Sequence, residues 1–229
     1  MFDDFAEMAM PALVIVLIVI AVGLAGYLAY RKKTNGGREI TSKSQWTTKE
    51  ITTAALCIGA SFLLSFIKLF SMPNGGSITP ASMLPMIAFS YIYGFKKGFI
   101  AGLCYGVLQF VQEPFFLSFP QFALDYLASF SLLALAGFAR KNIIPGILYG
   151  CGARFVCQFL SGWIFFGMYA PEGMPAWLYS LGYNGTVVGI ECAICIAVSL
   201  IPALRHFFDR TKAQAVAQQK VWKAARSAA

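Results

Sequence analysis

Seven long apolar segments, separated by short polar stretches, constrain the fold of this chain more than any other feature. The first, residues 10–30, has about the 20 apolar residues that an α-helix needs to cross a bilayer. The chain is 58% hydrophobic and 12% charged, whereas soluble domains are about 45–50% apolar and about 25% charged. We therefore predict an all-α, polytopic membrane protein. Its six later segments are 51–70, 82–93, 98–111, 122–139, 144–166 and 178–204.

The net charge of +8 is concentrated in alternate connections between these segments. Residues 96–97, 140–141 and 205–212 are basic, whereas the intervening loops carry little positive charge and include Glu113 and Glu172. This pattern follows the positive-inside rule, so we expect the basic connections in the cytoplasm and no nucleic-acid partner. The basic tail has two open interpretations: it lies on anionic membrane lipid, or it is a solvated end.

The predicted organisation has four parts. Residues 1–33 form an N-terminal transmembrane helix with its start outside, because its positive charges follow the apolar core, unlike those of a signal peptide. Residues 34–48 form a basic cytoplasmic linker, 49–208 a six-helix membrane domain, and 209–229 a basic cytoplasmic tail.

The residue types needed for catalysis or metal binding do not come together in the sequence. All six cysteines fall inside apolar segments, where cysteine behaves as a small hydrophobic residue. His206 is the single histidine, and no phosphate-binding G-x-x-x-x-G-K-[ST] loop is present. We predict no enzyme activity, no metal and no cofactor, so any energy for transport comes from a partner or an ion gradient.

Asp125 and Arg154 are ionisable residues inside apolar segments, where charge is costly and by default indicates a functional site. Two interpretations stand: a buried Asp125–Arg154 ion pair, or a site for a small cationic ligand. We favour the ligand site, because Gln158, Gly162 and Phe166 continue the Arg154 face of a helix at four-residue spacing. Further rings and hydrogen-bonding groups are available from Tyr126, Tyr169, Tyr179 and Asn184.

Small residues recur at helical spacing in two places. Gly94, Gly98, Gly102 and Gly106 fall on one helix face, which favours close packing inside the protein. A second strip consists of Ala54, Ala55, Gly59 and Ala60. It has two open interpretations: an internal seam, or a docking face for another membrane subunit. Lys68, near the outer end of the same segment, is interpreted as snorkelling to the interface.

Several longer motifs occur together between about Thr47 and Phe208. They are SMPNGGSITPASMLP (71–85), the glycine ladder, QFALDYLASFSLLALAG (121–137), SGWIFFGMYAPEGMP (161–175) and YSLGYNG (179–185). In these motifs the sequence resembles the thiamine-specific substrate-binding (S) components of energy-coupling factor (ECF) vitamin transporters. The resemblance implies six helices in a bacterial cell membrane, capture of thiamine from outside, and work with a transmembrane T component and two ATP-hydrolysing A subunits.

The resemblance also implies roles for single residues. Asp125 would grip the aminopyrimidine, with Tyr126 after it, and Arg154 would face the hydroxyethyl end of the ligand. Gln158 stands where the family usually has histidine. The remaining pocket positions are Phe115, Gly162, Phe166, Tyr179 and Asn184. At Phe115 and Phe166, relatives can have Tyr and Trp. Ala55 and Gly59 match the strip through which S components touch the T component.

The sequence thus predicts capture of thiamine or a close analogue without catalysis by this chain. The alternative is a standalone secondary carrier or channel for a small cationic solute, in which Asp125 and Arg154 would serve ion coupling or gating. Such a carrier would be expected to have internal repeats and paired broken helices, and the sequence has no convincing repeat. A membrane-embedded enzyme, the third class, lacks its catalytic residues.

Overall fold

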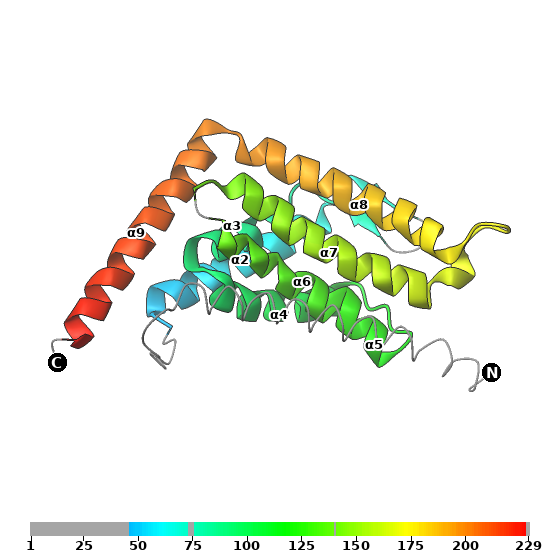
Figure 1. Cartoon of the computed structure of the whole chain (residues 1–229), viewed down its shortest axis with the longest axis horizontal. Coiled ribbons are helices and arrows are strands. Elements are labelled where there is room, and N and C mark those ends of the chain that lie inside the picture. Colours follow the sequence, from blue (N-terminus) through cyan, green and yellow to red (C-terminus); the bar gives the residue numbers. More distant parts are fainter. Residues whose placement is uncertain (1–45, 73–75, 140, 228–229) are drawn as a thin grey trace, which may run out of the picture. The chain divides into compact units, whose positions relative to one another are not determined.

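Helices make up most of the described structure, a computed structural model that covers residues 46–72, 76–139 and 141–227. From Thr47 onward these residues form one compact unit (Figure 1). The predicted N-terminal helix, 1–33, and the predicted linker, apart from its last residues, lie outside the described residues. One short two-stranded hairpin, β1 (Phe70–Ser71) with β2 (Ser77–Ile78), is the exception to the helical architecture of the described part.

Helix α2 (Thr48–Phe66) begins at a capping box. The Thr47 hydroxyl accepts the Glu50 backbone N–H (3.3 Å), and the Glu50 carboxylate accepts the Thr47 N–H (2.8 Å), which satisfies two of the free donors at the helix start. The other Glu50 oxygen pairs with Lys97 near the start of α4. The beginnings of α2 and α4 are therefore held together at the same end of the bundle.

Helices α3 (Leu84–Tyr93) and α4 (Phe95–Gln112) are joined by Gly94 alone, which adopts a φ of 88° that favours glycine. The α4 glycines face neighbouring backbone. A Cβ on Gly102 would lie 2.6 Å from the Phe130 carbonyl oxygen, one on Gly106 would overlap the Tyr126 carbonyl oxygen, and one on Gly98 would overlap Ser90. Apart from Gly94, which has open space at this position, the ladder is confirmed as an internal packing seam.

The next membrane-crossing segment, residues 119–138, is not a uniform α-helix. It consists of α5 (Phe119–Phe122), a π-helix η1 (Ala123–Ala128), one turn of α6 (Ser129–Ser131) and a 3₁₀-helix η2 (Leu132–Phe138). π-helical turns are rare and occur often at functional sites. Here the wide turn carries Asp125 and Tyr126.

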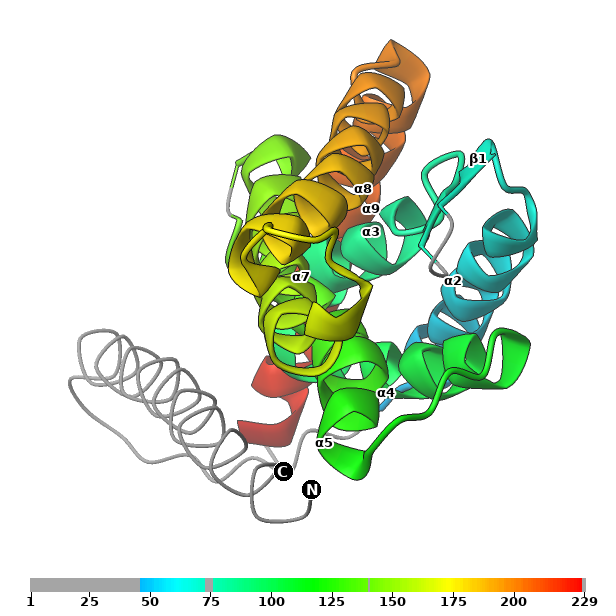
Figure 2. The same cartoon turned by 90° about the vertical axis from the view of Figure 1, so that its right-hand side faces the viewer.

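Two long helices, α7 (Ile143–Phe165) and α8 (Ala176–Ser199), lie side by side and are joined through the short 3₁₀-helix η3 (Gly167–Tyr169) (Figures 1 and 2). Asn142 caps α7 by accepting the Ile144 N–H at 2.9 Å. Gly162 marks a close approach between the two helices, because a Cβ there would overlap the Ser180 hydroxyl. The site described below lies between these helices and η1.

The last apolar segment differs from its predicted bounds of 178–204. Helix α8 ends at Ser199, and a separate helix, α9 (Pro202–Ser227), begins at the proline and runs across the end of the bundle (Figure 1). Proline suits the first turn of a new helix because it has no N–H to leave unpaired. The predicted basic tail, 209–229, is thus helical as far as Ser227.

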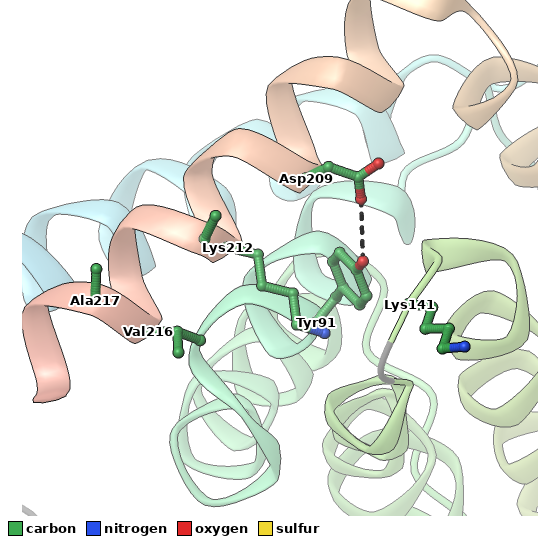
Figure 3. A pocket seen from close by; sticks show the side chains of 7 residues that line it. Tyr91, Lys141, Asp209, Lys212, Val216 and Ala217 are labelled. Atoms are coloured by element: carbon green, nitrogen blue, oxygen red, sulfur yellow. Dashed lines mark hydrogen bonds between the residues drawn. The ribbon is translucent and has the colours of Figure 1, made fainter.

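Helix α9 is held against α3 by polar contacts. The Tyr91 hydroxyl donates to Asp209 at 3.1 Å, and Lys212 lies over the Tyr91 ring, 3.5 Å from its centroid, while donating to the Ala139 carbonyl at 2.6 Å. Burial lowers the pKa of Lys212 below its ordinary value. Tyr91, Asp209 and Lys212 line a shallow hollow of about 620 Å³ together with Lys141 (Figure 3).

Four helical segments in the described part are long and apolar enough to cross a membrane: α2, residues 119–138, α7 and α8. Helix α3 is apolar but shorter. Together with α4, these segments correspond one to one with the six predicted for residues 49–208. The prediction of an all-α, multi-pass membrane protein is confirmed.

Candidate ligand-binding site

A cavity of about 490 Å³ lies among η1, α7, α8 and the loops that follow α2 and α4. All nine residues that the sequence analysis assigned to a ligand site line it: Phe115, Asp125, Tyr126, Arg154, Gln158, Gly162, Phe166, Tyr179 and Asn184. Their role in binding stays a prediction. Tyr169, a further candidate, is not among the lining residues and instead packs near the Phe166 ring, with centroids 6.0 Å apart.

Asp125 is held by its own helical segment. Its Oδ2 accepts a hydrogen bond of 2.7 Å from Gln121 Nε2, one wide turn earlier. Within the described residues it makes no ion pair. The alternative of a buried Asp125–Arg154 pair is therefore wrong, since Arg154 pairs with Glu191. The Asp125 carboxylate keeps further acceptor capacity on the cavity wall.

Gln121, which sequence reasoning did not assign to the site, is only 1% exposed and also lines the cavity. Besides Asp125, its amide donates to the Phe115 carbonyl (3.3 Å) and accepts the Leu117 N–H (3.1 Å). Glutamine suits this position because its amide both donates and accepts. Gln121 therefore fixes both the carboxylate and the loop beside it.

Tyr126 holds the same loop from the other side. Its hydroxyl donates to the Glu113 carbonyl at 2.7 Å and accepts the Phe115 N–H at 3.2 Å. Phe115 then stacks on Phe166, with ring centroids 5.3 Å apart and an interplanar angle of 27°. The Tyr126 hydroxyl is thus engaged by backbone, and its contribution to the cavity is the ring and the placement of Phe115.

The stripe on α7 is present as its four-residue spacing predicts. Arg154, Gln158 and Gly162 all line the cavity. Hydrogen bonds hold α8 against the same helix. Asn184 donates to the Gln158 backbone carbonyl (3.1 Å), and the Ser180 hydroxyl donates to the Phe159 carbonyl (2.7 Å). Gly162 and Asn184 therefore also serve the packing of α7 on α8.

Arg154 pairs with a residue that sequence reasoning missed. Its Nη1 lies 3.2 Å from Oε2 of Glu191, a carboxylate that is 2% exposed on α8. The other Glu191 oxygen accepts the backbone N–H of Thr79 (3.2 Å) and the Thr79 hydroxyl. The signal for Glu191 was available, because it is an ionisable residue inside an apolar segment just as Asp125 is.

The loop after α2 closes one side of the cavity. Its Gly76 N–H donates to the Tyr183 hydroxyl on α8 at 3.0 Å, and hairpin residues line the cavity. At the rim Lys68 pairs with Glu113, and both side chains are partly exposed, 37% and 43%. Lys68 therefore has an acidic partner, whereas the sequence analysis interpreted it as snorkelling alone.

The lining combines a carboxylate, a paired guanidinium, neutral amides and several ring faces. Ring faces attract cations, and a carboxylate accepts hydrogen bonds from amino groups. The volume is within the roughly 300–1,000 Å³ of small-molecule sites. Such an arrangement suits a small organic cation that also carries hydrogen-bond donors.

Three comparisons with known proteins agree on one family. Residues 51–209, more than half of the chain, match the family described as thiamine transporter protein (Thia_YuaJ). The chain is 32% identical over 173 residues to the thiamine transporter ThiT of Bacillus subtilis (strain 168), which covers 66% of this chain and 90% of that protein. Against ThiT of Lacticaseibacillus paracasei the identity is 27% over 136 residues, 51% of this chain and 68% of the relative.

A solved structure of ThiT from Listeria monocytogenes has a similar fold. It superposes with a TM-score of 0.59 at 26% sequence identity, and the match covers 68% of this chain and 96% of that structure. The fold similarity thus extends over nearly the whole of that structure.

Proposed function

This chain belongs to the thiamine transporter family, and from that premise we propose that it captures thiamine or a close pyrimidine or thiazole relative at the outer face of a bacterial cell membrane. The observation that carries the proposal is the cavity, whose lining includes nine of the residues that the sequence proposed for a ligand site. We propose no catalysis by this chain.

The chemistry of the lining supports this ligand. Thiamine combines an aminopyrimidine, a positively charged thiazolium ring and a hydroxyethyl arm. We infer that the Asp125 carboxylate accepts the aminopyrimidine donors, that ring faces such as the stacked Phe115 and Phe166 contact the cationic ring, and that Arg154 is the donor for the hydroxyethyl oxygen. Tyr179 and Asn184 complete the wall.

Outward capture is supported by the distribution of charge. The basic segments at residues 96–97, at Lys141 and on α9 lie at one end of the bundle, where Lys212 bonds to the Ala139 carbonyl. The cavity is lined by the loops at the other end. Because basic connections stay in the cytoplasm, the cavity opens toward the outside in this orientation.

We propose further that uptake is driven by partner subunits, a T component and two ATP-hydrolysing A subunits. The proposed docking strip on α2 supports this. Ala55 is exposed, and a Cβ on Gly59 would meet nothing within 4 Å. Within this strip Ala54 is buried and fits an internal seam, whereas Ala55 and Ala60 are exposed and favour docking, because small residues let a partner backbone approach closely.

Two measurements on the full chain test the proposal. Calorimetry of detergent-purified protein with thiamine is expected to give binding, and mass spectrometry of the purified protein to identify the vitamin as a co-purified molecule. Proteoliposomes that hold the chain alone are expected to bind but not accumulate thiamine, whereas those with partner subunits and ATP accumulate it. Accumulation by the chain alone would instead establish a secondary carrier, in which Asp125 and Arg154 serve coupling.

A further inference from the structure

The Arg154–Glu191 pair lies at the wall of the cavity with its two members in different positions. Arg154 lines the cavity and is 9% exposed, whereas Glu191 is 2% exposed and is not among the lining residues. The carboxylate is thus behind the guanidinium, with Nη1 and Oε2 3.2 Å apart. A ligand in the cavity therefore contacts Arg154, and Glu191 acts on the ligand only through its charge and through Arg154.

Glu191 is anchored independently of the arginine. Oε1 accepts two donors from Thr79, the backbone N–H at 3.2 Å and the hydroxyl, while Oε2 receives Arg154. Three donors therefore fix the position of this carboxylate. The arrangement therefore keeps a negative charge in a fixed place next to the arginine.

Arg154 has donor capacity left over. Its Nε–H is buried and has no acceptor among the described residues. The guanidinium lies over the ring of Phe130, which also lines the cavity, at 4.6 Å from the centroid. Buried polar groups are nearly always hydrogen-bonded, so the guanidinium keeps a donor that no group among the described residues satisfies.

We propose that Glu191 is a specificity-determining residue, which cancels the charge of Arg154 so that the cavity accepts an uncharged hydroxyl at this wall and disfavours a phosphate ester. The inference rests on the proposed function and concerns the same site. An unpaired arginine is a strong partner for phosphate. With a carboxylate fixed beside the guanidinium, its attraction for a dianion is offset by repulsion from Glu191. A neutral oxygen is not repelled in this way and can still accept a hydrogen bond from the guanidinium.

The direct test compares thiamine with thiamine monophosphate on detergent-purified full-length protein. The wild type is expected to prefer thiamine. Glu191→Gln, which keeps the shape and removes the charge, is expected to shift the affinity ratio toward the monophosphate by about tenfold or more, since charges a few ångströms apart interact strongly at a partly buried site. The double variant Glu191→Gln with Arg154→Gln is expected to lose this gain.

A matched control is Glu172→Gln, which removes an exposed carboxylate that does not line the cavity. It is expected to leave the ratio unchanged. A purely structural role of Glu191 would weaken both ligands alike, and a ratio in Glu191→Gln equal to that of the wild type overturns the proposal.

A second measurement uses only the wild type, so it does not depend on a folded variant. A phosphate monoester loses its second proton near about pH 6. The affinity ratio of monophosphate to thiamine is therefore expected to rise severalfold as the pH falls from 7.5 to 5.5, and a constant ratio overturns the proposal. Absence of thiamine binding would instead overturn the proposed function.

Discussion

Charged side chains at and behind the cavity wall owe their positions to neutral neighbours as much as to opposite charges. Asp125 is bonded by Gln121, and Glu191 by Thr79 and Arg154. A ligand that binds Asp125 therefore meets a carboxylate already aligned, with no cation to displace within the described chain. Prior alignment lowers the ordering cost of binding.

We expect Asp125→Asn to weaken thiamine binding far more than it lowers the melting temperature. Hydrogen bonds to a charged group contribute about 1.5–3 kcal/mol, so affinity should fall by roughly tenfold or more. Calorimetry and thermal unfolding on the same preparation measure both quantities. Glu172→Gln is the control for loss of an acidic group, and an Asp125→Asn protein that melts earlier but binds normally would remove this carboxylate from the site.

Gln158 should behave as a fixed neutral donor and acceptor, because a carboxamide does not titrate. Gln158→His is expected to preserve thiamine binding and to add a pH dependence centred near about 6.5. Affinity should fall on the acid side, where the imidazolium repels the cationic ligand. Titrations from pH 5.5 to 8 on wild type and variant measure this.

Gln158→Leu completes the same series. It should weaken binding by about 1–3 kcal/mol if a ligand polar group loses its partner. Curves that coincide for all three proteins would show that the Gln158 side chain does not contact the ligand.

Much of this site could be predicted at the residue scale, because each candidate had a local signal. Asp125 and Arg154 are charges in apolar segments, and Gln158 follows at helical spacing. The ion pair could not be predicted. The sequence alone does not tell whether Arg154 pairs with Asp125 or with Glu191. Gln121 was missed because its bonds to a loop backbone leave no mark in a pattern of side chains.

At the scale of single helices, the glycines differ in whether they face neighbouring backbone or open space. On α4, Gly102 and Gly106 face backbone of the 119–138 segment, whereas Gly59 on α2 and Gly152 on α7 have open space where a Cβ would be. Sequence spacing showed a strip in α4 and in α2 but not which neighbour each strip meets. The bounds of the helices were predictable from hydropathy, but the break at Leu200–Ile201 was not, because the apolar run continues through it.

Gly59→Leu is expected to abolish uptake in cells that carry the partner subunits while the purified protein still binds thiamine. A Cβ at this position would meet no atom of the described residues within 4 Å, whereas the leucine side chain would obstruct a partner backbone. Gly152→Leu, at an equally open position on another helix, is the matched control and should transport normally. Loss of thiamine binding in the isolated Gly59→Leu protein would contradict a docking role.

Gly102→Ala should act in the opposite way, by lowering stability. The added methyl group would lie 2.6 Å from the Phe130 carbonyl oxygen, so α4 and the next segment must separate. Overpacking of this kind costs about 1–3 kcal/mol. Thermal unfolding in detergent measures it against Gly189→Ala, whose new methyl group meets nothing within 4 Å, and equal melting temperatures would refute the seam.

At the scale of the whole molecule, two ends with different chemistry are separated by the bundle. One end has basic residues and α9, fastened through Tyr91, Asp209 and Lys212. The other end has the loops that line the cavity. This polarity was predictable, since the positive-inside rule needs only the order of charges along the chain. The position of α9 at the basic end was not predictable, because the contacts that hold it join residues far apart in the sequence.

The orientation can be measured in intact cells with a membrane-impermeant maleimide. Glu172 and Lys141 are exposed residues in connections at opposite ends. Glu172→Cys should label without permeabilisation and Lys141→Cys only after it, with the parent protein as the blank for its six native cysteines. The reverse labelling pattern would place the cavity on the cytoplasmic side.

The π-helix at residues 123–128 also has a meaning for the ancestry of the site. Such a turn holds one residue more than the α-helical turn it replaces, so it is the trace that a single inserted residue leaves in a helix. Removing one residue there would turn the π-helical turn into an α-helical one but rotate one flank relative to the other by about 100°. Asp125 and the backbone that meets Gly106 could then no longer both keep their partners. We therefore expect alignments of relatives to tolerate gaps in the loops and to exclude them from this one turn.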